Sequence, residues 1–193
     1  MRRYPRIGVL ALQGDFREHR LMLESVGAEV VEVRLPKHLR DVSGLIIPGG
    51  ESTTIGKLAR EYEIDEAVKE KRKKEGLAIW GTCAGAIWIA QRIIGHQQPH
   101  LPLMDIAVRR NAFGRQVDSF EALLEIAGLN TPFKGVFIRA PEIVDVGSQV
   151  EVLSRYQGKI VFARQGNAWA TSFHPELTDD ARLHEMFIST AKN

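Results

Sequence analysis

The sequence predicts an α/β protein of three layers, in which helices cover both faces of a mixed sheet that is mostly parallel at its centre. Two observations support this fold class. In the first half of the chain, short apolar runs typical of buried strands alternate with helical patterns, and this order implies parallel strands joined by helices. In residues 150–173, turn signals follow one another at the spacing of hairpins, which implies an antiparallel extension of the sheet.

The elements of the first half can be placed in order. Four apolar runs have the length and composition of buried strands: residues 7–12, 29–34, 44–50 and 77–80. The helix after the first run is marked by Asp15 and Glu18, which have the spacing of a capping box, and by Gly27, which is positioned to end it. Helical segments follow the third run up to about residue 75, and a helix is expected over residues 84–94.

The second half of the chain has a different character. Turn signals at 157–158 and 165–167 separate strands that should pair as antiparallel hairpins, and a helix over residues 179–191 follows them. The chain shows neither an internal repeat nor a low-complexity linker, and 193 residues are enough for one sizeable core. We therefore expect residues 1–193 to form a single domain.

The composition argues against several functional classes. Apolar stretches run for about ten residues, well short of the roughly 20 needed to cross a bilayer, so no membrane-spanning segment is expected. The net charge of +2 is small, and glutamates interrupt the one basic cluster at residues 69–76, which argues against nucleic-acid binding. The single cysteine cannot form an internal disulfide, and a free thiol fits a reducing cytoplasm.

The single cysteine, Cys83, lies in the sequence GTCAGA at the junction of a predicted strand and a predicted helix. Glycines two residues before and after a nucleophile are typical of the sharp strand-to-helix turn called a nucleophile elbow. This position also places the sulfur at a helix N-terminus, where the helix dipole favours a thiolate. The alternative is a buried cysteine that packs as a small hydrophobic side chain, and the flanking glycines favour the nucleophile.

A thiolate nucleophile requires a base and a group that orients the base. His174 ends an apolar strand, and Glu176 lies two residues further, where an extended backbone would direct both side chains to one face. Pro175 favours that extended backbone at His174. The other histidines are expected to be solvated surface residues: His19, His38, His96, His100 and His184.

The glycine-rich turn at residues 48–52, PGGES, is a candidate for the backbone donors that an oxyanion needs. The alternative is a simple strand-to-helix turn capped by Ser52. Ligands of open α/β sheets bind beyond the carboxyl ends of the strands. Because this turn, Cys83 and His174 all fall at such ends, we expect them to form one site.

These motifs resemble one family. GTCAG with FHPE downstream resembles the class I, triad-type glutamine amidotransferases, which implies a flavodoxin-like sheet. More narrowly, the chain resembles the glutaminase subunits of pyridoxal 5′-phosphate synthase along essentially its whole length. The motifs that carry this narrower resemblance are GVLALQGDFREH, LIIPGGESTT, RRNAFGRQVDSFE, GVFIRAPEI and FHPELTDDARLHEMF.

The resemblance implies that Cys83, His174 and Glu176 hydrolyse L-glutamine to glutamate and ammonia through a glutamyl thioester. It implies no cofactor and no metal, and it implies a partner synthase subunit that receives the ammonia and raises the activity. The glutamine-binding positions that it carries over are Gly50, Glu51, Ser52, Arg110, Ile138 and Arg139. A guanidinium suits the α-carboxylate of glutamine, and the alternative for both arginines is a structural ion pair. The expected oxyanion donors are the backbone N–H groups of Gly50 and Ala84.

Two alternatives stay open at this point. The chain could be a glutaminase that feeds a different synthase, which the co-purifying enzyme would reveal. It could also be a non-catalytic α/β protein in which Cys83 senses oxidation. His174 and Glu176 argue against a sensor, because a sensor needs no positioned base.

Overall fold

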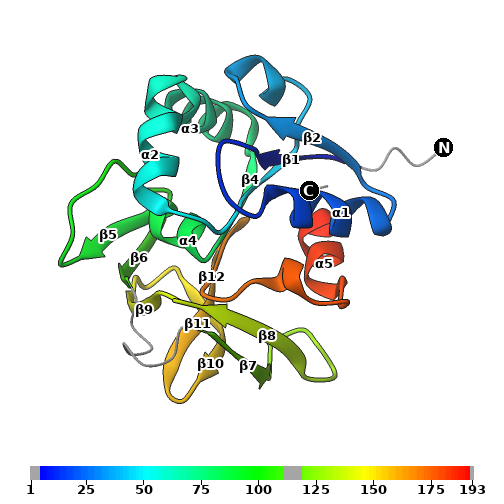
Figure 1. Ribbon diagram of the computed structural model, residues 1–193, viewed down its shortest axis with the longest axis vertical. Helices are drawn as coiled ribbons and strands as arrows, with labels where there is room; N and C mark the ends of the chain where they lie inside the picture. The colour runs from blue at the N-terminus through cyan, green and yellow to red at the C-terminus, as the bar shows by residue number, and fades with distance from the viewer. Residues whose placement is uncertain (1–4, 111–118, 192–193) are drawn as a thin grey trace.

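The computed structural model describes residues 5–110 and 119–191, and Figure 1 shows its layers. The parallel part of the main sheet runs in the order β2 (Glu29–Val33), β1 (Arg6–Leu10), β3 (Gly44–Ile47), β4 (Ala78–Thr82) and β12 (Ala168–Thr171). β3, β4 and β12 are buried along their whole length. Burial on both faces explains why they read as continuous apolar runs in the sequence.

The sheet continues beyond β12 with mixed pairing. The next strands are β11 (Lys159–Gln165), β9 (Glu142–Val146), β6 (Met104–Arg109) and β5 (Ala90–Ile94), and β10 (Glu151–Tyr156) pairs with β11. Both predicted hairpins are confirmed, because β10 and β12 each pair with β11 in the antiparallel direction. β7 (Ser119–Leu124) and β8 (Phe133–Ile138) form a separate antiparallel pair.

Helices lie on both faces of the sheet (Figure 1). α2 (Ser52–Glu61), α3 (Ile64–Glu75) and α4 (Ala84–Ile89) share one hydrophobic core with β3, through side chains such as Ile55, Val68 and Ile47. α1 (Phe16–Ser25) and α5 (Arg182–Thr190) share the core of the opposite face. The predicted three-layer fold class is therefore confirmed.

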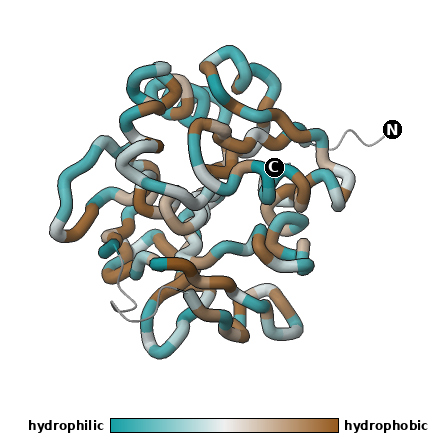
Figure 2. The backbone as a smooth tube through the Cα atoms, in the orientation of Figure 1, coloured by the Kyte–Doolittle hydropathy of each residue, from teal (hydrophilic) through white to brown (hydrophobic). Residues whose placement is uncertain are grey.

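Aromatic side chains fill the core beneath α1 and α5. The Trp80 ring lies 5.6 Å from the Trp169 ring and 5.5 Å from the Phe187 ring, and all three are almost fully buried. Tilted ring pairs at this separation add stability beyond the area that they bury. Figure 2 shows that hydrophobic residues mark the strands and that hydrophilic residues gather on the outer connections. No helix within residues 5–110 or 119–191 is both long and apolar enough to cross a membrane.

One predicted element is wrong. The sequence predicts a helix over residues 84–94, but α4 ends at Ile89 and residues 90–94 form β5. The backbone turns to an extended conformation at Ala90, with a ψ of 143°, and β5 then pairs in parallel with β6. The run AIWIAQRII is apolar enough for a buried helix, and the pairing with β6 decides the outcome because tertiary contacts override local propensity.

Candidate active site

The candidate site lies where several strands end. Gln13 and Asp15 follow β1, the PGGES turn follows β3, Cys83 follows β4 and His174 follows β12. These four strands are parallel, so their carboxyl ends meet at one edge of the sheet, where open α/β sheets bind ligands. Together with residues that follow β6 and β8, these connections enclose a cleft of about 370 Å³.

The cleft brings together the residues that the sequence analysis singled out. All of them except Glu176 line it: Gly50, Glu51, Ser52, Cys83, Ala84, Arg110, Ile138, Arg139 and His174. Glu176 is buried behind His174, in the short 3-10 helix η2 (Pro175–Leu177). Gln13, Asp15 and Ile87 also line the cleft, and the sequence analysis gave them no role there.

Cys83 lies on a strained turn. Its φ of 47° and ψ of −105° fall in a region that side-chain-bearing residues rarely adopt, which is characteristic of a nucleophile elbow. Gly85 makes the turn possible, because a Cβ at that position would lie 2.0 Å from the carbonyl oxygen of Ile47 in β3. The Cys83 thiol is 7% exposed, and its Sγ lies 3.8 Å from the Ile138 carbonyl oxygen.

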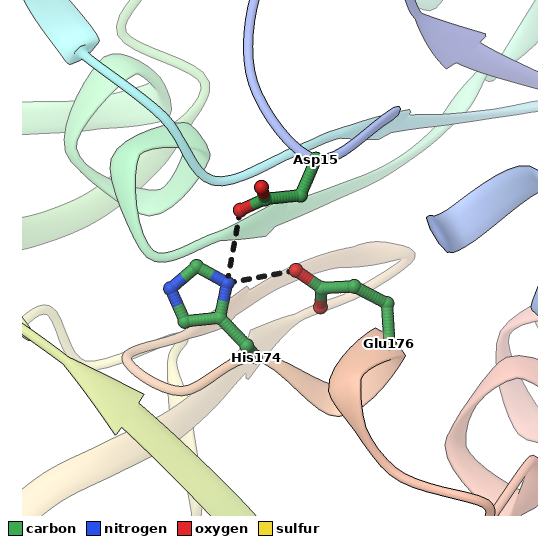
Figure 3. A group of neighbouring side chains, drawn as sticks. All are labelled: Asp15, His174 and Glu176. Carbon is green, nitrogen blue, oxygen red and sulfur yellow. Dashed lines mark hydrogen bonds and ion pairs between the residues drawn. The ribbon is translucent and has the colours of Figure 1, made fainter. Parts of the chain in front are cut away.

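His174 is held by two carboxylates, as Figure 3 shows. Its Nδ1 lies 2.7 Å from Oε1 of Glu176 and 3.3 Å from Oδ2 of Asp15. Burial alone would lower the pKa of His174, but hydrogen bonds to these carboxylates and to Cys83 outweigh burial and raise the pKa to about 12. At neutral pH the imidazole therefore carries both protons, with Nδ1–H directed at carboxylate and Nε2 left for the sulfur.

Within the described ranges, Asp15, His174 and Glu176 are also the group that could offer metal ligands, because their ligand atoms lie within 4.8 Å of one another. A metal-bound histidine must present an unprotonated nitrogen. With no ion bound, the raised pKa of His174 keeps Nδ1 protonated between the two carboxylates, and the two carboxylates position that proton.

Asp15 is a site residue that the sequence analysis missed. The capping box predicted for Asp15 and Glu18 is wrong, because the Asp15 side chain makes no capping hydrogen bond and turns to His174 instead. The backbone N–H of Asp15 donates to the Gly49 carbonyl oxygen at 3.1 Å. Its position after β1 was the available signal, since β1 ends at the same edge of the sheet as β3 and β4.

The PGGES turn is fixed by the segment that follows β1. Gln13 Oε1 accepts a hydrogen bond of 2.7 Å from the backbone N–H of Glu51. The alternative in which Ser52 caps the next helix is wrong, because the Glu51 carboxylate caps α2 by accepting from the backbone N–H groups of Thr53 and Thr54. Ser52 is buried, and its hydroxyl donates to Gln98.

Glu51 and Arg110 form an ion pair at the mouth of the cleft, with 3.2 Å between Oε1 and Nη2. Partial burial tends to raise the pKa of Glu51, but the hydrogen bonds from Thr53 and Thr54 outweigh it and lower the pKa to about 2. Arg110 also donates to Gln98 Oε1 at 3.0 Å. The rest of the motif that begins with Arg110, residues 111–118, lies outside the described residues.

Gly49 packs directly against the His174 ring, since a Cβ at this position would lie 2.3 Å from Cε1. We expect Gly49→Ala to displace His174 from Glu176 and to lower kcat by about a hundredfold or more, because misplacing a reacting group by 1 Å costs that much. Steady-state glutamate release measures the effect. Gly128→Ala is the control for backbone destabilisation alone, because Gly128 has a φ of 93°, which strains any side chain there, and it does not line the cleft. Normal kcat in Gly49→Ala would contradict the prediction.

The expectation that His19 and His184 are solvated is wrong, since both side chains are fully buried. They lie on the inner faces of α1 and α5, and His19 Nε2 is 3.2 Å from Oε2 of Glu176. The signal in the sequence was the spacing of position 19 from Phe16 and Leu23, which puts all three on one face of a helix. The charged residues on either side of His19 in the sequence obscured this helical spacing.

Known proteins of one family match this chain along nearly its whole length. The profile of the SNO glutamine amidotransferase family matches residues 9–193, so the chain belongs to this family. A Thermus thermophilus protein named pyridoxal 5′-phosphate synthase subunit PdxT is 58% identical over 186 residues, which cover 96% of this chain and 97% of that protein. The protein of the same name from Pelotomaculum thermopropionicum is 57% identical over 95% of this chain and 93% of its own.

Solved structures give the same result. A crystal structure titled as a glutamine amidotransferase matches with a TM-score of 0.93 and 55% identity over 97% of this chain and 99% of that chain. A putative GMP synthase subunit from Thermoplasma acidophilum shares the fold, with a TM-score of 0.72 at 17% identity, covering 100% of this chain and 96% of its own. The resemblance stated from the sequence motifs is thereby confirmed, and this chain is a glutamine amidotransferase.

Proposed function

We propose that Cys83, His174 and Glu176 are the catalytic triad with which this chain hydrolyses L-glutamine to glutamate and ammonia. The observation that carries the proposal is the chain of contacts from buried Glu176 through His174 to the strained nucleophile turn at Cys83. An imidazolium held beside a thiol favours the thiolate, which is the nucleophilic form of cysteine.

The proposed reaction begins when the thiolate attacks the side-chain amide carbon of glutamine. The backbone N–H groups of Gly50 and Ala84 are the proposed donors to the resulting oxyanion, because both residues line the cleft beside Cys83. The His174 imidazolium then gives its Nε2 proton to the leaving nitrogen, so ammonia departs and a thioester remains. Neutral His174 next takes a proton from water, hydroxide attacks the thioester, and glutamate leaves as the thiolate and imidazolium are restored.

The proposed recognition of glutamine uses the ion pair at the mouth of the cleft. An amino acid carries an ammonium and a carboxylate, and Glu51 and Arg110 offer the two complementary charges. Both side chains are partly exposed, so a ligand can reach them. Ser52, Ile138 and Arg139 line the same cleft and complete the proposed glutamine site.

The proposed acceptor of the ammonia is the synthase subunit of pyridoxal 5′-phosphate synthase, in a hetero-oligomeric complex. The proposal rests on the relatives named as subunits of that enzyme. Ammonia made without an acceptor is lost, so we expect low activity in the free chain. A docked partner could complete the oxyanion site by turning the Gly49–Gly50 peptide, which one backbone hydrogen bond to Asp15 holds in place. A cytoplasmic location is part of the proposal, because the reaction needs Cys83 as a free thiol.

The test is glutamate release from L-glutamine by the purified chain, alone and mixed with a pyridoxal 5′-phosphate synthase subunit. We expect weak release alone and strong stimulation by the partner. Comparable turnover in both conditions would contradict the dependence on the partner. No glutamate in either condition would overturn the proposed function and would direct attention to oxidation of Cys83, which mass spectrometry after mild peroxide treatment detects.

A further inference from the structure

A buried row of polar groups continues behind the proposed triad, on the side of Glu176 that faces away from His174. His19 Nε2 lies 3.2 Å from Oε2 of Glu176 and 3.1 Å from the Thr82 hydroxyl. On the other edge of the ring, His19 Nδ1 lies 3.0 Å from Nε2 of His184. The side chains of His19 and Glu176 are fully buried, and His184 is too.

Both histidines are neutral in this environment. Burial lowers the pKa of His19 well below its usual value, and the nearby rings of His184 and His174 lower it further. Burial also lowers the pKa of His184 to about 3. A neutral imidazole has one N–H and one acceptor nitrogen, so each ring can donate only once.

The contacts select one arrangement of these protons. If Nδ1 of His19 held the proton, the Nε2 lone pair of His19 would face the carboxylate oxygen of Glu176, and His184 would have to bury an unpaired Nδ1–H. If His184 Nε2–H donates to His19 Nδ1 instead, the Nε2–H of His19 faces Glu176 and Thr82. In that arrangement His184 Nδ1 is an acceptor without a partner among the described residues. A buried acceptor without a partner costs less free energy than the buried, unpaired N–H of the first arrangement.

We propose that His19, oriented by His184, is a positioning residue that holds the Glu176 carboxylate in the orientation in which it accepts Nδ1–H of His174. The inference rests on the proposed triad. Oε2 of Glu176 is buried, and no donor within the described ranges, His19 included, forms an aligned hydrogen bond with it. His19 Nε2 lies 3.2 Å from this oxygen and is placed to donate to it, while its aligned partner is the Thr82 hydroxyl.

The surroundings of His174 explain why Glu176 needs a positioning residue. Asp15 is a second carboxylate on Nδ1 of His174, and it is partly exposed while Glu176 is buried. Burial raises the pKa of Glu176, although the interaction with His174 opposes the rise, so a donor to Oε2 helps to keep the carboxylate ionised. Without this donor, Glu176 would protonate at a higher pH and His174 would be left with Asp15 alone.

The experiment compares His19→Leu, which removes the donor, with His19→Gln, which can present an amide N–H at a similar reach. We expect His19→Leu to lower kcat by about tenfold to a hundredfold, the worth of one hydrogen bond to a charged group, with KM for glutamine little changed. In the pH profile of kcat/KM for His19→Leu, we also expect the acid limb to move to higher pH. His19→Gln should recover most of the lost kcat and reverse most of this pH shift.

The control is Leu23→Ala, which opens a cavity one turn further along α1 and leaves the contacts of Glu176 intact. It should destabilise the fold without moving the acid limb. An unchanged acid limb in His19→Leu, or a His19→Gln variant as impaired as His19→Leu, would overturn the inference. Cys83→Ala tests the triad separately. If Cys83→Ala is inactive while His19→Leu has a normal pH profile of kcat/KM, the role proposed for His19 is rejected and the proposed triad stands.

A second variant covers the case in which His19→Leu does not fold. His184→Met removes the donor to His19 Nδ1, and we expect a smaller loss of kcat with a shift of the acid limb in the same direction. The Nδ1 proton of His174 gives an independent readout by NMR. We expect its low-field resonance to move in both variants and to stay in place in Leu23→Ala, and an unmoved resonance in both variants would contradict the inference.

Discussion

Cys83→Ala is expected to abolish glutamate release, by at least about 10⁴-fold, because Cys83 is the one thiol of the chain and the Ser52 hydroxyl of the cleft donates to Gln98 instead. The fold should survive. Alanine removes only the sulfur, which contacts Ile138 at 3.8 Å, and deleting one buried atom of this size costs about 1 kcal/mol. Glutamine turnover in the presence of the synthase subunit, together with a thermal unfolding curve, measures both effects.

The same variant has a second expected readout. The hydrogen bond to Cys83 is one cause of the raised pKa of His174, so the pKa of His174 should fall in Cys83→Ala while staying above its ordinary value. An NMR titration of His174 follows this change. Glu176 and Asp15 remain in contact with Nδ1 and keep the proton there. Ammonia release that survives in Cys83→Ala would show that the proposed mechanism is wrong.

Acid is expected to destabilise the fold steeply below about pH 6.5, because two buried neutral histidines become charged when the chain unfolds. His19 and His184 have pKa values lowered by burial in the folded state and ordinary values in the unfolded chain. Their contribution to stability is therefore present above about pH 6.5 and is lost as pH falls toward their folded pKa values. Each histidine contributes a slope of up to about 1.4 kcal/mol per pH unit in this range.

The shifted pKa values of His174, Glu176 and Glu51 do not produce this loss of stability between pH 5 and 6.5. His174 has a raised pKa, so its contribution is fully present below about pH 6.5 and is lost progressively as pH rises from there toward 12. Glu176 also has a raised pKa, and it acts in the opposite direction by gaining a proton in the folded state as pH falls. Glu51, with a pKa lowered to about 2, contributes only in stronger acid.

Urea unfolding measured at several pH values tests the prediction. Replacing His184 with Phe should remove one titrating group and reduce the slope by up to about 1.4 kcal/mol per pH unit. His96→Gln is the matched control, because His96 is exposed and should leave the slope unchanged. A slope in His184→Phe equal to that of the unmodified chain would show that His184 takes no part in acid unfolding.

The fold, and the gathering of the candidate residues in one cleft, were predictable because local patterns determine them. Buried parallel strands read as apolar runs, and Gly85, two residues after Cys83, marks a turn that only glycine permits. The strand β5 was not predictable, because its sequence also suits a helix and only the pairing with β6 distinguishes the two. Asp15 was missed for a related reason, since the sequence alone does not show that β1 lies next to β3.

The histidines behind Glu176 show a second limit. His19 and His184 come from helices 165 positions apart in the sequence, and only the packing of α1 against α5 brings them into contact. Charged neighbours made both appear to be surface residues. Helical periodicity could have identified the buried face on which His19 lies, but it could not show that the Glu176 carboxylate packs against that face.

The position of β12 has a consequence for the order in which the protein becomes active. Among the described strands this one comes last in chain order, yet it lies between β4 and β11 in the middle of the sheet. His174 and Glu176 follow it, so the proposed nucleophile at the end of β4 meets its proposed base only after β12 has been synthesised and has paired with β4. If the proposed triad is correct, a chain in which β12 has not yet paired with β4 is unable to release ammonia, and completion of the central sheet is the step that enables the chemistry.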